Sequence, residues 1–163
     1  MQPELFIKMV LDAWNAQIKR TDDLFNQLSD EQLMAEISPG RNRGVYLLGH
    51  LAAVHDKIFP IMNLGKEINP GMYEVFVAAP DKSGVKIPPI SEVKLYWKKV
   101  NSSLAEQISK LSTEEWFQRH TSVSEEDFKK EPHRNKLNII ISRTNHLAFH
   151  LGQLILLKPR NQE

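Results

Sequence analysis

The sequence predicts an all-α protein built as a four-helix bundle, and three observations support this prediction. Apolar residues recur at alternating steps of three and four positions in four long segments, which is typical of helices that pack nearly parallel in a bundle. No segment shows sustained alternation of polar and apolar residues, so little or no sheet is expected. With 163 residues and no cysteine, the chain suits one domain, 1–163, without disulfides or thiolate metal sites.

The apolar stripes define the expected helices in chain order. They comprise Leu11, Trp14, Ile18, Phe25 and Leu28 in the first helix, Leu47, Leu51, Val54, Ile58 and Ile61 in the second, Val93, Trp97, Val100, Leu104, Ile108 and Leu111 in the third, and Ile140, Leu147, Leu151 and Leu154 in the fourth. Asn42 and Ser91 stand ahead of the second and third stripes. Because such side chains accept hydrogen bonds from the first free N–H groups of a helix, both are expected to be N-caps.

Two further boundary signals follow the first and third helices. Ser29 with Gln32, and Ser112 with Glu115, have the spacing of a capping box, in which each side chain accepts a hydrogen bond from the other residue's backbone. Each pair predicts a short helical turn. Pro159 is expected to end the fourth helix, because proline cannot continue the backbone hydrogen-bond ladder.

The connection from 63 to 90 is long and rich in proline and glycine. Such a length is unusual in a compact domain and is often functional. It predicts a long crossover between the second and third helices, which are then not a simple hairpin. A second irregular stretch covers 120–134. We expect these two segments to shape any substrate pocket.

Composition and charge argue against two classes of partner. The net charge is +1 and no basic block stands out, so nucleic acid is not expected as a partner. The apolar runs are too short or too interrupted to span a bilayer, so no membrane association is expected. The N-terminus lacks the basic start and apolar run of a signal peptide. These features predict a cytoplasmic protein.

The most informative segment is 145–153, which places His146 and His150 four residues apart in an apolar helical run. Residues at this spacing share one helix face, so both imidazoles can bind one metal ion. His50 lies in another strongly apolar segment and is the candidate for a third ligand. Three neutral imidazoles with an open position are typical of a catalytic metal site, whereas structural sites are closed by four protein ligands. Buried histidines that only form hydrogen bonds are the alternative.

The remaining histidines fit the site less well. His55 follows His50 by five positions, which rotates it roughly 140° around the helix, so it cannot share the target of His50 and is expected to be partly exposed. His120 and His133 lie in the irregular stretch and are interpreted as surface residues, with an approach of either one to the site as the alternative. Metalloprotease, di-iron, phosphate-loop and serine-hydrolase motifs are all missing from the sequence.

Together these residues resemble the DinB-like superfamily, whose members are also described as YfiT-like metal-dependent hydrolases. The match lies in the run 48–51 around His50 and in His146, His150, Gly152 and Gln153 of the last helix. It covers nearly the whole chain, from the first helix to Pro159.

The resemblance implies a four-helix bundle with up-down-down-up connectivity that is often dimeric. It also implies one divalent metal ion per chain, zinc or nickel, held at His50, His146 and His150. Characterised relatives include transferases that attach low-molecular-weight thiols, such as bacillithiol or mycothiol, to electrophiles. The sequence does not identify catalytic residues. Arg143 is first interpreted as part of a surface or dimer salt bridge, and the alternative is that it orients an anionic thiol or substrate.

The leading functional hypothesis is a metal-dependent enzyme that activates a water or a low-molecular-weight thiol for hydrolysis or S-transfer to a small-molecule substrate. The alternative is a non-enzymatic bundle in which the metal or the histidine cluster braces the core or a small-ligand pocket. Glu67, Glu74 or Asp81 would favour bracing if one of them closed the fourth ligand position. Apolar residues on nearly every side of the last helix also predict a homodimer.

Overall fold

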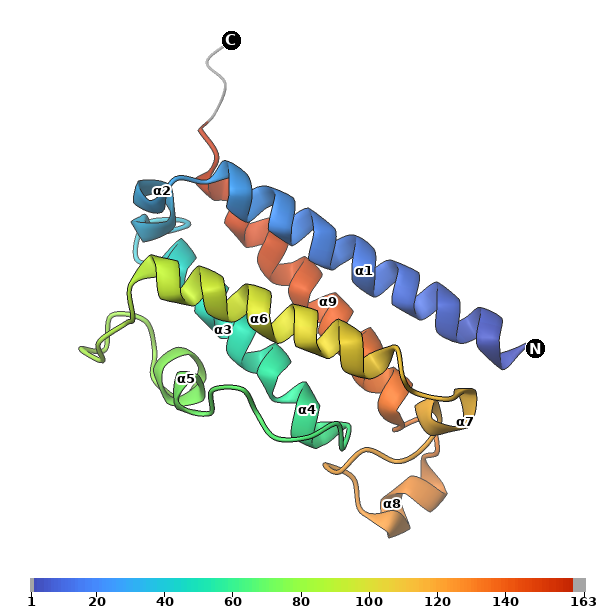
Figure 1. Ribbon diagram of the computed structural model, residues 1–163. Helices are drawn as coiled ribbons and strands as arrows, with labels where there is room; N and C mark the ends of the chain where they lie inside the picture. Colours follow the sequence, from blue (N-terminus) through green and yellow to red (C-terminus); the bar gives the residue numbers. More distant parts are fainter. Residues whose placement is uncertain (1, 160–163) are drawn as a thin grey trace.

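Four long helices form the body of the protein in the computed structural model, which describes residues 2–159 (Figure 1). They are α1 (Pro3–Gln27), α3 (Gly44–Asp56), α6 (Ile90–Ile108) and α9 (Lys136–Leu154). The shorter elements are α2 (Asp30–Met34), α4 (Ile58–Ile61), α5 (Gly71–Tyr73), the π-helix η1 (Glu74–Ala78), α7 (Thr113–Trp116), α8 (Glu125–Lys130) and the 3-10 turn η2 (Ile155–Leu157). No strand occurs in residues 2–159, so the all-α prediction is confirmed.

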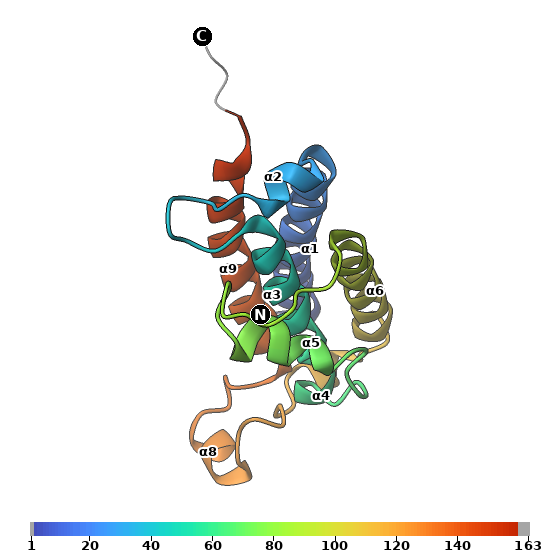
Figure 2. The same cartoon turned by 90° about the vertical axis from the view of Figure 1, so that its left-hand side faces the viewer.

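The long helices pack as two neighbouring pairs. α3 lies against α6, and α1 lies against α9. In Figure 1 the chain runs from right to left in α1 and α9, and from left to right in α3 and α6. Because α3 and α6 point the same way, residues 62–89 must carry the chain back along the bundle, as the length of this connection indicates (Figures 1 and 2).

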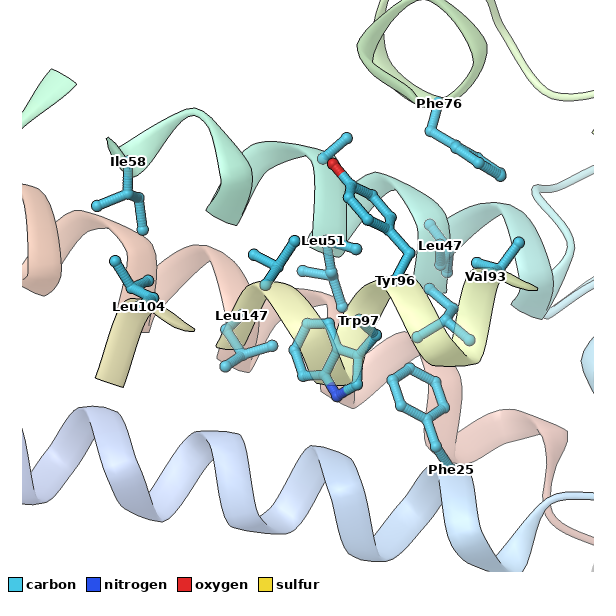
Figure 3. Packing of buried hydrophobic residues seen from close by; sticks show 14 of the residues in the cluster. Phe25, Leu47, Leu51, Ile58, Phe76, Val93, Tyr96, Trp97, Leu104 and Leu147 are labelled. Carbon is cyan, nitrogen blue, oxygen red and sulfur yellow. The ribbon is translucent and has the colours of Figure 1, made fainter. Parts of the chain in front are cut away.

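Most residues of the predicted apolar stripes meet in one continuous core (Figure 3), whereas Val54 and Ile61 of the second stripe are half-buried and line a cavity beside α9. Leu51, Leu104 and Leu147, from three different long helices, are almost completely buried. The ring of Phe25 meets Trp97 edge to face, with 5.8 Å between ring centroids. Burying one such side chain stabilises the fold by about 1.5–3 kcal/mol. These contacts fix how α3 and α9 lie, and the site histidines are on these two helices.

Both predicted capping boxes are present. The Ser29 hydroxyl accepts from the backbone of Gln32, and the Gln32 side chain accepts from the backbone N–H of Ser29 at 2.8 Å. Ser112 and Glu115 form the same pair of hydrogen bonds. The two short turns, α2 and α7, therefore begin where the sequence predicts.

The predicted N-caps at Asn42 and Ser91 are wrong. α3 begins at Gly44 after Arg43, and no side chain caps it. Its first N–H groups are satisfied from elsewhere, because the backbone N–H of Gly44 donates to a carbonyl at residue 35 and that of Arg43 donates to Asp81. α6 begins one residue before Ser91, directly after a proline with no side-chain cap.

The long connection is partly helical and packs onto α3. The Phe76 ring of η1 is fully buried and lies against Gly49, where an added Cβ would come within 2.4 Å of the ring. The Tyr46 hydroxyl donates a 2.7 Å hydrogen bond to the Ala79 carbonyl. A segment without apolar periodicity is thereby held against the helix that carries His50. In the part of the chain described, no helix is both long and apolar enough to cross a membrane.

Candidate metal centre

The three histidines predicted as ligands lie together at the contact between α3 and α9. The Nε2 atom of His146 is 3.2 Å from Nε2 of His50 and 3.1 Å from Nε2 of His150. The donor atoms of the three side chains lie within 4.8 Å of one another. One helix turn separates His146 from His150, and the packing of α3 on α9 supplies His50.

This spacing fits a single shared ion. Metal–nitrogen distances of about 2.0–2.1 Å in a tetrahedral site place neighbouring nitrogens about 3.3 Å apart. Two of the Nε2 separations are close to that value. Within residues 2–159 the group contains histidines alone, with no carboxylate. Three imidazoles can therefore hold one divalent ion while leaving a ligand position free.

Hydrogen bonds on the far side of two rings fix their tautomers. His50 Nδ1 lies 2.9 Å from the main-chain carbonyl of Phe76, and His150 Nδ1 lies 2.7 Å from Oε1 of Gln153. Both oxygens only accept, so each Nδ1 carries the proton and donates it. Each Nε2 then presents a lone pair to the centre, the arrangement found for metal-ligating histidines.

Hydrogen bonds alone cannot satisfy all the nitrogen lone pairs of the three histidines. Its Nδ1 is buried and has no partner among the described residues. A neutral imidazole carries one N–H, whereas the Nε2 atoms of His50 and His150 both present a lone pair to His146 Nε2. At least one lone pair is therefore left without a proton to accept. A cation at the centre would satisfy all three, which favours a metal over a bare hydrogen-bond cluster.

The surroundings keep the cluster in its metal-binding form. Burial first, then the neighbouring His150 and His50 and the charge of Arg143, lower the pKa of His146 to about 4. Burial is also the main cause that lowers the pKa values of His50 and His150. The rings are thus neutral at pH 7, and only neutral imidazole binds a metal ion.

Phe76 is the site residue that sequence reasoning missed. It contacts His50 through its main-chain carbonyl, and the amino-acid type at a position does not reveal a role of the main chain. The only signal was Gly49, beside His50, which leaves room for the Phe76 ring. Gln153 was noted only as part of a motif, and its contact with His150 gives it an orienting role. Gly152 has open space around it, and nothing in the structure explains its place in the motif.

His55 does not join the cluster, as predicted, but the expectation that it is partly exposed is wrong. Its side chain is fully buried. The ring lies between Trp14 and Trp97, with centroid distances of 4.8 and 5.2 Å, and Nδ1 is 2.8 Å from Oδ1 of Asn101. The helix face that points away from His50 is covered by α1 and α6, so a histidine there belongs to the core. Burial lowers the pKa of His55 to about 3.

The other two histidines also lie outside the cluster. His133 is exposed, as interpreted from the sequence, but His120 is buried, which corrects its assignment to the surface. The chain at His120 folds back on the end of α4, where the Thr121 backbone N–H donates to the Ile61 carbonyl at 2.9 Å. The irregular stretch is therefore held against the helical body next to His120.

A cavity of about 380 Å³ borders the cluster at His146. Its lining comprises Val54, Lys57, Ile61, Tyr73, Val77, Arg143 and His146. The 63–90 connection therefore contributes to its wall, whereas 120–134 supplies none of these residues. A larger cavity of about 600 Å³ lies between α1 and α6, but no histidine lines it. The chemistry therefore points to the smaller cavity.

None of the three carboxylates considered as a fourth ligand joins the histidine cluster. Glu67 pairs with Lys57, and Asp81 pairs with Arg43 at 2.6 Å. Glu74 is exposed. Arg143, expected in a salt bridge, is half-buried and has no ion pair within residues 2–159.

Comparison with known protein families shows to which family the chain belongs. The family model of the DinB superfamily matches residues 13–154, which include all three histidines. The chain belongs to the DinB superfamily. Comparison with individually curated proteins returned no match. Membership in the DinB superfamily and the convergent histidines together agree with a metal-dependent role.

Proposed function

We propose that this DinB-superfamily protein is a metal-dependent enzyme whose metal ion is held by His50, His146 and His150. It would either transfer a thiol to a small-molecule substrate or hydrolyse that substrate. The observation that carries the proposal is the convergence of three Nε2 atoms next to a cavity, with no carboxylate in the group among the described residues. When bound, a divalent ion, zinc or nickel, would act as a Lewis acid toward a water or a low-molecular-weight thiol.

The chain's own residues give the site its geometry. The Phe76 carbonyl and the Gln153 amide oxygen orient His50 and His150, so their lone pairs point inward without further rearrangement. The three ligands come from only two helices, which gathers the imidazoles on one side of the shared point. The opposite side is then free for a substrate, which supports catalysis over a purely bracing role.

The cavity supports the same reading. Apolar side chains of Val54, Ile61 and Val77 form part of its wall, and such a wall excludes water from the reacting atoms. The chain contains no cysteine, so a thiol nucleophile would have to be a co-substrate. Thiol transfer is therefore proposed as a two-substrate reaction, and hydrolysis as the reaction in which water takes the place of the thiol.

A paired activity screen tests this proposal. Zinc-loaded and nickel-loaded protein would be incubated with a small thiol and an electrophilic alkyl halide, and separately with ester and amide substrates. We expect turnover in one of the two sets that disappears in the His150→Ala variant and is retained in His133→Ala, whose histidine is exposed and remote from the cluster. Metal binding without any turnover above the His150→Ala background would favour the bracing role.

A further inference from the structure

The cavity beside His146 contains a charge that no described residue of the protein neutralises. Arg143 precedes His146 by three residues on α9, so both side chains lie on one helix face and both line the cavity. Arg143 is half-buried, and its Nε atom is buried without a hydrogen-bond partner. No carboxylate of residues 2–159 forms an ion pair with it.

A half-buried guanidinium without a counter-ion is unfavourable. Burial lowers the pKa of Arg143, but arginine keeps its charge in proteins, so it cannot escape desolvation by losing its proton. Its charge helps to keep the neighbouring rings neutral, because it is one of the smaller causes, after burial, that lower the pKa values of His50 and His146. Burial is the main cause of those lowered pKa values, so the charge is not needed for them, and no carboxylate of residues 2–159 offsets it, which points to an external anion.

The second cation of the cavity is already engaged. The Lys57 ammonium pairs with Glu67 at 2.5 Å and lies 4.5 Å from the centroid of the Tyr73 ring. An anion entering the cavity would therefore find Arg143 as its available partner. A planar carboxylate matches the planar guanidinium, which can donate two parallel hydrogen bonds to it.

We infer that the cavity is a subsite for a small anionic substrate, whose carboxylate binds Arg143 while its reacting atom lies at the three histidines. The inference rests on the proposed function and names the class of substrate that the site takes. Val54 and Val77 supply an apolar wall, which suits a short hydrocarbon chain between the carboxylate and the reacting atom. A cavity of about 380 Å³ holds a molecule of this size.

The test compares two thiols of nearly the same size and shape, one with an anionic carboxylate and one with a neutral amide. Protein loaded with Co²⁺, a coloured substitute for zinc, would be titrated with 3-mercaptopropionate and with its neutral amide, 3-mercaptopropionamide, and the thiolate-to-cobalt absorption band would report binding. We expect the carboxylate to bind about tenfold more tightly or better, as charge-assisted hydrogen bonds do. Arg143→Gln should reduce that ratio to near one.

Lys57→Gln is the matched control, because it removes the other cation of the same cavity, and it should keep most of the preference. Equal affinity for the two thiols in the unaltered protein would overturn the inference and leave the proposed function standing. So would an unchanged preference in Arg143→Gln. The comparison of the two thiols in the unaltered protein needs no variant, so it tests the inference even if Arg143→Gln misfolds.

Absence of cobalt binding would instead refute the proposed function. The anion subsite would then be tested on the metal-free protein by NMR titration of the Arg143 Nε–H signal with propionate and propionamide. A shift with propionate alone supports the subsite, and no shift with either compound overturns it.

Discussion

Gly49 of α3 lies directly against the ring of Phe76, and the next residue, His50, binds the carbonyl of Phe76 through Nδ1 at 2.9 Å. A Cβ at residue 49 would come within 2.4 Å of the ring. The same close approach thus packs η1 on α3 and orients His50, a candidate metal ligand. Both depend on a residue without a side chain.

Replacing Gly49 with alanine should therefore harm stability and metal binding together. We expect a loss of about 1–3 kcal/mol in unfolding free energy from overpacking, together with weaker metal binding as the Phe76 carbonyl moves. Urea denaturation and metal titration would measure both. Gly152→Ala is the control, because nothing lies within 4 Å of its added Cβ. That variant should gain up to about 1 kcal/mol from helix propensity. Equal effects at the two glycines would contradict this account.

Gln153 should act on the metal through His150. Gln153→Leu removes the acceptor that lies 2.7 Å from His150 Nδ1, so we expect metal affinity to fall by about 10–100-fold. Gln153→Glu keeps an acceptor oxygen in place and should lose much less. A competition titration with a chelating dye would measure both affinities. If leucine and glutamate weaken binding equally, Gln153 does not orient the ligand.

Burial of His55 predicts a pH-dependent stability. Its folded pKa is about 3, below the ordinary value of 6.5 that applies to the unfolded chain. As the pH falls, His55 is protonated in the unfolded chain before it is protonated in the folded protein. Its contribution to the free energy of unfolding is therefore fully present above about pH 6.5 and is lost as the pH falls toward 3. The contribution reaches about 1.4 kcal/mol per pH unit.

Urea unfolding of metal-free protein between pH 7 and 5 would test this prediction. His55→Phe keeps a ring between Trp14 and Trp97 but cannot titrate, so its stability should fall less steeply with pH than that of the unaltered protein. His133→Ala, at an exposed position, should leave the slope unchanged. Identical slopes for His55→Phe and the unaltered protein would show that His55 does not contribute.

The sequence was sufficient to predict that three histidines cluster and where the long helices lie, because both follow from helical spacing. His146 and His150 share a face by their separation, and His50 follows from its apolar surroundings. Other features depend on packing between distant segments. His55 is buried because α1 and α6 cover its helix face, and the Phe76 carbonyl reaches His50 only once η1 docks on α3. Asn42 does not cap α3, because the helix begins at Gly44 and Arg43, held by Asp81 of the long connection, occupies the N-cap position.

The homodimer stays a prediction, and the surface formed by α1 and α9 suggests where a second copy would bind. Phe6 and Met9 are exposed on α1, and with Ile141 of α9 they line an apolar groove of about 260 Å³. A second copy covering this face would bury them. Light scattering should return twice the mass of one chain, and Met9→Lys should shift the protein toward monomer. Leu95→Lys, at an exposed position on α6, should not. The mass of one chain for the unaltered protein at micromolar concentration would refute the dimer.

The most direct test of the central claim is the metal content of protein purified without chelators, measured by inductively coupled plasma mass spectrometry. The three converging histidines predict about one divalent ion per chain, lost for the most part in His50→Ala, His146→Ala and His150→Ala, and retained in His133→Ala. Because each of the first three variants removes one of only three protein ligands, none should bind normally. Undiminished metal content in the His146→Ala and His150→Ala variants would contradict the proposed site.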